Sequence, residues 1–135
     1  MKNSLFGVII KVNNIDVCRN FYQKVLDLSD PVVDSSFCVE FQINDNFFLT
    51  LEKTDARFLE HQSSATSWSY KVNSIDDVLY RSRLHGYTLN VSKRTHEGEV
   101  LYRCEDPEKN IFYVFSDKEQ SNDDKKTVKL ENPSS

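Results

Sequence analysis

The sequence contains little cysteine and little glycine, and this scarcity excludes several kinds of site. Among its 135 residues only Cys18, Cys38 and Cys104 are cysteines, and they lie far apart. An odd and scattered set argues against a disulfide framework and against a zinc module, which needs clustered pairs. The three glycines form no phosphate-binding loop, and neither a Gly-x-Ser-x-Gly nor a Cys-x-x-Cys motif occurs.

Long hydrophobic runs and an excess of positive charge are also lacking. No apolar run approaches the roughly 18–20 residues that a membrane span needs. The first residues lack the apolar stretch and small-residue cleavage site of a signal peptide. The formal charge is −4 and the basic residues are dispersed, which argues against nucleic-acid binding. We therefore expect a cytoplasmic protein, with neither membrane nor nucleic acid as a partner.

The sequence does contain an internal repeat. Residues 11–16 read Lys-Val-Asn-Asn-Ile-Asp and residues 71–76 read Lys-Val-Asn-Ser-Ile-Asp, so five of six positions match. Each copy follows a short apolar run and precedes a helical pattern. The match in sequence and in context indicates two related halves.

Hydrophobic periodicity predicts the same elements in each half. A helix over residues 15–26 is predicted after Asn14 as N-cap, and a second over residues 75–85 is predicted between Ser74 and Gly86. The first helix has an apolar face made by Ile15, Cys18, Phe21, Tyr22 and Val25. Three strand-like stretches follow each helix, at residues 31–33, 37–43 and 47–52 and at residues 88–93, 100–104 and 111–116. The pattern predicts an α+β fold built from two βαβββ modules.

These elements divide the chain unevenly. We expect one domain over residues 1–117, with half-modules at about 5–52 and 67–117 and a linker at 53–66. Residues 118–135 contain no aromatic side chain and are rich in Asp, Lys, Asn and Ser. This composition predicts a polar, mobile tail.

Three stretches in this order resemble the vicinal oxygen chelate superfamily of glyoxalase I, bleomycin resistance proteins, extradiol dioxygenases and fosfomycin-resistance enzymes. They are Gly7–Val12 with Phe21–Leu26, Ser67–Val72 with Leu84–Gly86, and the Asp-Pro turn over Cys104–Asn110. The resemblance covers about residues 5–117. It implies curved mixed sheets around a cavity, with the helices on the outer face. Asp27 and Lys109 stand where the family usually has glycine, and Asp tolerates the left-handed conformation at modest cost.

The resemblance also implies where a metal ion would be held. Enzymes of the family bind one divalent ion through His, Glu or Gln at four strand positions, which here are Gly7, Thr50, Ser67 and Tyr113. None of the four is an ordinary ligand for such an ion. Glu52 is the nearest replacement, on the same face of its strand. The three histidines, His61, His85 and His96, lie elsewhere and are interpreted as surface residues. We therefore expect neither a metal nor a cofactor.

Strand alternation separates a core face from a cavity face. Cys18 and Cys104 are assigned to packing and Cys38 to the opposite face, where nothing near it in sequence would activate the thiol. The cavity face combines aromatic surface, hydroxyls, acids and an arginine, as small-molecule sites do. The predicted ligand-binding residues are Glu40, Phe48, Thr50, Glu52, Ser67, Arg103, Tyr113 and Phe115. These side chains could equally fill the cavity or a dimer interface.

Three functions remain open from the sequence. The first is a metal-free binding protein like the bleomycin resistance proteins, which hold a planar, often cationic ligand in a cleft between two protomers. The ligand could be an antibiotic, and the resemblance also implies a homodimer. The second is a metal-dependent lyase, isomerase or dioxygenase with a displaced site. The third is a degenerate module that serves only for dimerisation. The absent ligands favour the first, so we expect a binding protein and no catalytic residues.

Overall fold

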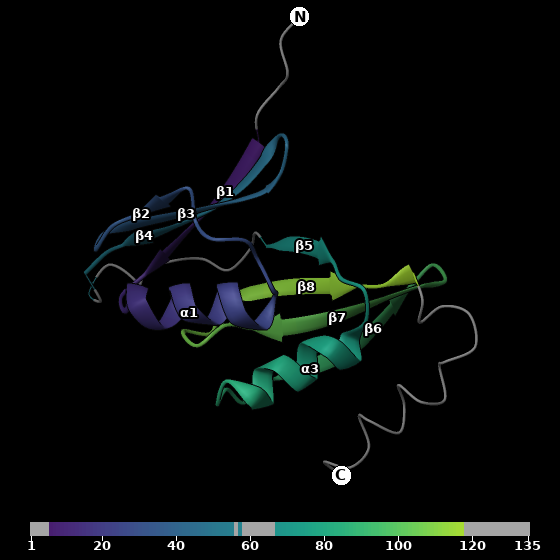
Figure 1. Cartoon of the computed structure of the whole chain (residues 1–135). Helices are drawn as coiled ribbons and strands as arrows, with labels where there is room; N and C mark the ends of the chain where they lie inside the picture. Colours follow the sequence, from purple (N-terminus) through teal and green to yellow (C-terminus); the bar gives the residue numbers. More distant parts are fainter. Residues whose placement is uncertain (1–5, 56, 58–66, 118–135) are drawn as a thin grey trace, which may run out of the picture.

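The computed structural model describes residues 6–55, 57 and 67–117, and within them the two halves repeat one topology (Figure 1). The first half contains β1 (Phe6–Val12), α1 (Ile15–Val25), β2 (Val33–Asp34), β3 (Cys38–Asn44) and β4 (Phe47–Lys53). The second contains β5 (Trp68–Lys71), α3 (Ile75–Leu84), β6 (Val91–His96), β7 (Glu99–Glu105) and β8 (Ile111–Phe115). The predicted tail, most of the predicted linker and His61 lie outside the described residues.

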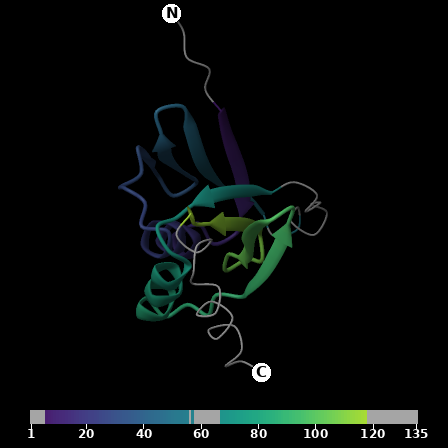
Figure 2. The same ribbon diagram turned by 90° about the vertical axis from the view of Figure 1, so that its right-hand side faces the viewer.

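Both halves build the same four-stranded mixed sheet. The strand orders are β1-β4-β3-β2 and β5-β8-β7-β6, and the first two strands of each order are parallel. Each sheet is curved and neither closes into a barrel (Figure 2). The predicted α+β fold with tandem βαβββ modules is therefore confirmed. No helix in the described segments has the length and apolar character needed to cross a membrane.

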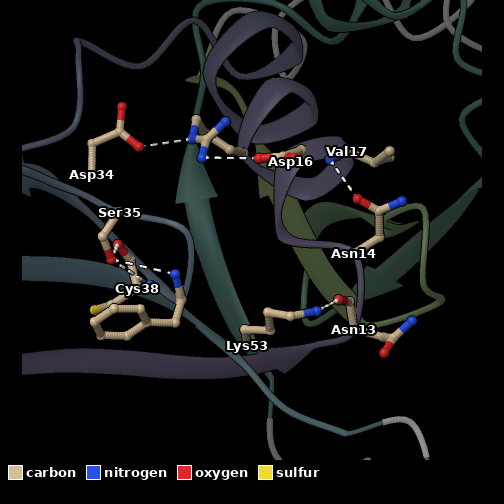
Figure 3. Close-up of polar contacts among 10 residues, drawn as sticks. Asn13, Asn14, Asp16, Val17, Asp34, Ser35, Cys38 and Lys53 are labelled. Carbon is tan, nitrogen blue, oxygen red and sulfur yellow. Dashed lines mark hydrogen bonds and ion pairs between the residues drawn. The ribbon is translucent and has the colours of Figure 1, made fainter.

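Local hydrogen bonds explain where the helices begin and end. The side-chain oxygen of Asn14 accepts from the Val17 N–H at 3.1 Å (Figure 3), and the Ser74 hydroxyl accepts from the Asp77 N–H at 3.3 Å. Gly86, after the second helix, has a φ of 84°. Both predicted caps and the predicted glycine stop are confirmed.

The two positions where this chain lacks the usual glycine keep the backbone that glycine favours. Asp27 has a φ of 59° and Lys109 a φ of 69°, so both adopt the left-handed conformation. A side chain there costs some stability, since the Cβ crowds the following carbonyl. The turns after α1 and before β8 therefore survive the substitutions.

The strand predicted over residues 88–93 is displaced along the chain. Residues 88–90 are a loop and β6 runs from Val91 to His96, three residues later than the sequence indicated. The β6–β7 hairpin turns at Glu97 and Gly98, with φ values of 51° and 83°. A two-residue turn with positive φ matches the twist of paired strands, so the ladder continues to His96, which the sequence had placed in the turn.

The helix α1 forms the centre of the molecule, because it packs against both sheets (Figure 1). Its buried residues face β3 and β4 of its own half. Its rings also reach the other half, where Phe21 lies edge-on to Phe112 at 6.1 Å and Tyr22 lies 6.2 Å from Trp68. One shared core therefore joins the halves, and it includes the cysteines Cys18 and Cys104, both fully buried as predicted.

Candidate functional site

The face of the first sheet that points away from α1 is here named the first open face. Gly7, Ile9 and Lys11 of β1 lie on it beside Phe48, Thr50 and Glu52 of β4 and Cys38, Glu40 and Gln42 of β3. The alternate residues Val12, Leu49 and Leu51 are buried against the core. Ile9 is 62% exposed, so an apolar side chain lies in the middle of an uncovered surface.

The first open face carries more negative than positive charge. The Thr50 hydroxyl donates to Glu40 at 3.4 Å, and the Lys11 ammonium lies 3.5 Å from the Glu52 carboxylate. The Glu52–Lys11 pair is about half exposed, so it adds little to stability. Two carboxylates against one ammonium leave this face suited to a cationic group.

Next to this face, the turn before β3 is held by local hydrogen bonds. The Ser35 hydroxyl accepts from the Cys38 N–H at 3.0 Å and donates to the Cys38 carbonyl at 3.1 Å (Figure 3). Phe37 is 65% exposed in this turn. Cys38 itself is a half-buried free thiol on the first open face, as predicted.

The corresponding face of the second sheet is the second open face. Its residues are Ser69 and Lys71 of β5, Ile111, Tyr113 and Phe115 of β8, Glu99, Leu101, Arg103 and Glu105 of β7, and Ser92 and Arg94 of β6. Arg103 lies 3.5 Å from Glu105 and directly opposite Tyr113. Three cations against two carboxylates leave this face with the opposite net charge to the first.

The structure places the predicted ligand-binding residues on two separate surfaces. Glu40, Phe48, Thr50 and Glu52 lie together on the first open face. Arg103, Tyr113 and Phe115 lie together on the second, and Ser67 directly precedes β5 at its edge. Because α1 packs on the core side of both sheets, the two open faces point away from the shared core. A single chain therefore does not enclose both sets.

Two basic residues of the second open face were missed as site residues. Lys71 follows Ser69 by two positions, so strand alternation alone could have found it. Arg94 of β6 lies opposite Leu101 of β7. Its face depended on the register of a strand whose limits the sequence misplaced, so no sequence signal could have found it.

The four positions implied for a metal do not offer a donor set. A Cβ added to Gly7 would lie 3.1 Å from the Phe48 carbonyl oxygen, so even the first atom of a ligating side chain is crowded there. Thr50 and Tyr113 are half-buried and offer only hydroxyls. Ser67 is exposed and also offers only a hydroxyl. Within residues 6–55, 57 and 67–117, no three His, Cys, Asp or Glu side chains form a group that could hold a metal ion. The described residues therefore do not fit the metal that the family implies.

A buried polar network joins the halves behind the open faces. The Tyr22 hydroxyl donates to Asp106 at 2.7 Å, and Asp106 also accepts from the backbone N–H groups of Glu108 and Asn110 at 2.8 and 2.9 Å. Glu108 in turn accepts from the backbone N–H groups of Asn13 and Asn14. The Asp-Pro turn of the second half therefore holds the start of α1.

Burial keeps two thiols and the Tyr22 hydroxyl of this core protonated. Burial raises the pKa of Cys18 and raises that of Cys104 to about 12, so neither thiol forms a nucleophilic thiolate at neutral pH. Burial, followed by the charge of Asp106, raises the pKa of Tyr22 and keeps its hydroxyl a donor. These two thiols and this hydroxyl therefore have a structural role.

Comparisons with known proteins give structural relatives and no sequence relatives. No protein-family model matches the chain, and no curated protein matches its sequence. A glyoxalase-related enzyme from Fulvimarina pelagi is similar in structure, with a TM-score of 0.64 and 12% identity over 87% of this chain and 90% of that one.

Two further solved structures agree. A glyoxalase/bleomycin resistance protein/dioxygenase family enzyme from Burkholderia phytofirmans gives a TM-score of 0.64 at 17% identity, over 84% of this chain and 98% of its own. A fosfomycin resistance protein from Mesorhizobium loti gives 0.58 at 15% identity, over 85% and 91%. At these identities the likeness establishes the fold. The chain therefore has the vicinal oxygen chelate fold that its three sequence motifs indicated.

Proposed function

We propose that this chain is a metal-free small-molecule-binding protein of the glyoxalase/bleomycin resistance type. One observation carries the proposal: the four strand positions that would hold a metal are Gly7, Thr50, Ser67 and Tyr113, with no donor set among the described residues. A protein that binds a ligand without making or breaking a covalent bond requires no metal. The residues beside these positions instead form aromatic and acidic surface.

The ligand of this proposal is a planar or cationic molecule, of which an antibiotic is one example. Glu40 and Glu52 supply negative charge on the first open face, and Phe48 lies beside them for stacking. Tyr113 and Phe115 supply further rings on the second open face. An aromatic ring attracts a cation placed over its face, and more strongly when water is excluded.

A homodimer would bring the two sets together. Seating the first open face of one copy on the second open face of another pairs an acidic surface with a basic one. A two-fold axis repeats the contact, so two equivalent clefts form. Each cleft would contain all eight predicted ligand-binding residues.

The first test measures metal content. Protein purified without chelator should contain no stoichiometric divalent metal by elemental analysis. A bound metal at one equivalent per chain would falsify the proposal and favour a displaced site that includes Glu52.

The second test measures ligand binding by thermal shift with planar cationic compounds. A true ligand raises stability by RT ln(1 + [L]/Kd), and Glu40→Gln and Glu52→Gln should each reduce the shift. Asp45→Asn removes the same charge from the exposed β3–β4 turn and should leave it unchanged. A dimer that gains no stability from any compound would support the dimerisation module instead.

A further inference from the structure

A cavity of about 660 Å³ lies where the two halves meet, away from the centre of either open face. The start of β1 and the β3–β4 turn form one side of it, and β5 with the end of β8 forms the other. Figure 2 shows β5 crossing below the first sheet at this junction. Its volume is within the range of small-molecule sites, at about 300–1,000 Å³.

Aromatic side chains from both halves line this cavity. Phe6 and Phe47 line it and lie on the core side of the first sheet. Phe115 also lines it and lies on the second open face. Phe6 is 62% exposed although it sits beside the junction. Three rings from three strands suit a planar apolar ligand.

The polar lining points to an anionic group on that ligand. Lys71 is the only charged residue among the described residues that line the cavity, and none of these carries a carboxylate. The ammonium lies 2.7 Å from Asp117, which leaves two of its three protons to donate. Ser69, Asn44 and Asn46 add further groups that can donate.

Tyr70 and Lys71 also line a smaller cavity of about 160 Å³, and that cavity contains acids. Asp27 and Asp77 line it together with Arg81. Burial raises the pKa of Tyr70 and the charge of Asp27 raises it further, because Asp27 lies on the side of the smaller cavity. An anion is therefore favoured in the larger cavity, where no described lining residue carries a carboxylate.

We propose that the cavity between the halves is a second binding site, for a small planar aromatic carboxylate whose ring lies among Phe6, Phe47 and Phe115 and whose carboxylate pairs with Lys71. The site shares Phe115 with the proposed function, but it needs neither Glu40 nor Glu52. It also takes a ligand of opposite charge.

The test titrates 2-naphthoate into the full chain and follows amide shifts by NMR and affinity by calorimetry. Shifts should concentrate at Phe47, Ser69, Lys71 and Phe115. Lys71→Gln should weaken 2-naphthoate binding about threefold to tenfold and leave the neutral 2-naphthalenemethanol unaffected. Lys11→Gln, the matched loss of an ion-paired strand lysine on the first open face, should change neither affinity.

A second pair of variants tests the aromatic wall. Phe6→Ala should weaken both probes, whereas Phe37→Ala, which truncates an equally exposed ring outside the cavity, should weaken neither. The proposal is overturned if 2-naphthoate causes no shifts at millimolar concentration. It is also overturned if the shifts lie on the first open face, or if Lys71→Gln and Lys11→Gln behave alike.

Discussion

Tyr22 and Asp106 form the least solvent-exposed acid–hydroxyl pair described in this fold. Burial raises the pKa of Asp106 above its ordinary value, and hydrogen bonds from Tyr22, Asn110 and Glu108 lower it in part. The folded chain therefore binds this proton more tightly than the unfolded chain does. The stability that Asp106 contributes is complete below its unfolded pKa and is lost as pH rises through the raised, folded pKa.

This sign predicts a pH-dependent effect of Tyr22→Phe. The variant removes one donor from the carboxylate, which raises the folded pKa further. Urea unfolding should show a loss of about 2 kcal/mol at neutral pH and a smaller loss at a lower pH, where more of the carboxyl is protonated. Tyr80→Phe removes a hydroxyl that is 58% exposed and should cost nothing measurable at either pH. An equal loss at both pH values would show that Asp106 is protonated throughout.

At the scale of elements, α1 is shared between the two halves. Its rings contact Trp68 and Phe112 of the second sheet, and its N-cap residue Asn14 donates its backbone N–H to Glu108. The Arg81 side chain of α3 also donates to the carbonyl of Val25 at 2.9 Å. Part of the surface that α1 buries therefore lies against the other half of the chain.

Because α1 is shared, we predict that neither half folds alone. A fragment of residues 1–57 would expose the rings of Phe21 and Tyr22. It would also lose the hydrogen bonds from Asn13 and Asn14 to Glu108. Its circular dichroism should show no cooperative thermal transition, whereas the full chain should unfold in one step. A cooperative transition in the fragment would mean that the first sheet alone stabilises α1.

The sequence predicted elements better than their arrangement. Both caps, the apolar face of α1 and the core alternation depend on residues a few positions apart, so local rules could predict them. The limits of β6 depended on a hairpin turn without an Asn-Gly signal. The position of α1 between the sheets depended on ring contacts about 50 to 90 residues distant in sequence, which no local pattern encodes. For the same reason, alternation placed each predicted ligand-binding residue on a face and could not show that the two faces are separate.

At the scale of the whole molecule, the two open faces remain uncovered in one chain. Ile9 and Val33 lie on the first open face and are 62% and 42% exposed. Exposed apolar surface of this kind commonly marks an interface. The opposite charges of the two faces suit a second copy of the chain.

We therefore predict that Ile9→Glu converts a dimer to a monomer. The substitution adds a carboxylate to the centre of the first open face without disturbing the core, since Ile9 is exposed. Light scattering should give the mass of two chains for the natural protein and of one chain for the variant. Leu84→Glu places the same change on α3, where the side chain is 61% exposed, and should leave the dimer intact. A natural protein that is already monomeric would remove the cleft between copies from the proposed function.

The hydrogen bonds that Glu108 accepts from Asn13 and Asn14 also have a consequence during synthesis of the chain. The Asn13 N–H that it accepts from lies 95 residues earlier in the sequence. At about 5–20 residues per second, a ribosome needs roughly 5 to 20 seconds to add that stretch. During this interval the nascent first half has its helix sequence but neither Glu108 nor the rings of Trp68 and Phe112 that pack on α1. The packing around α1 is therefore completed only when the last strands emerge. Until then the nascent chain must remain soluble without its complete core.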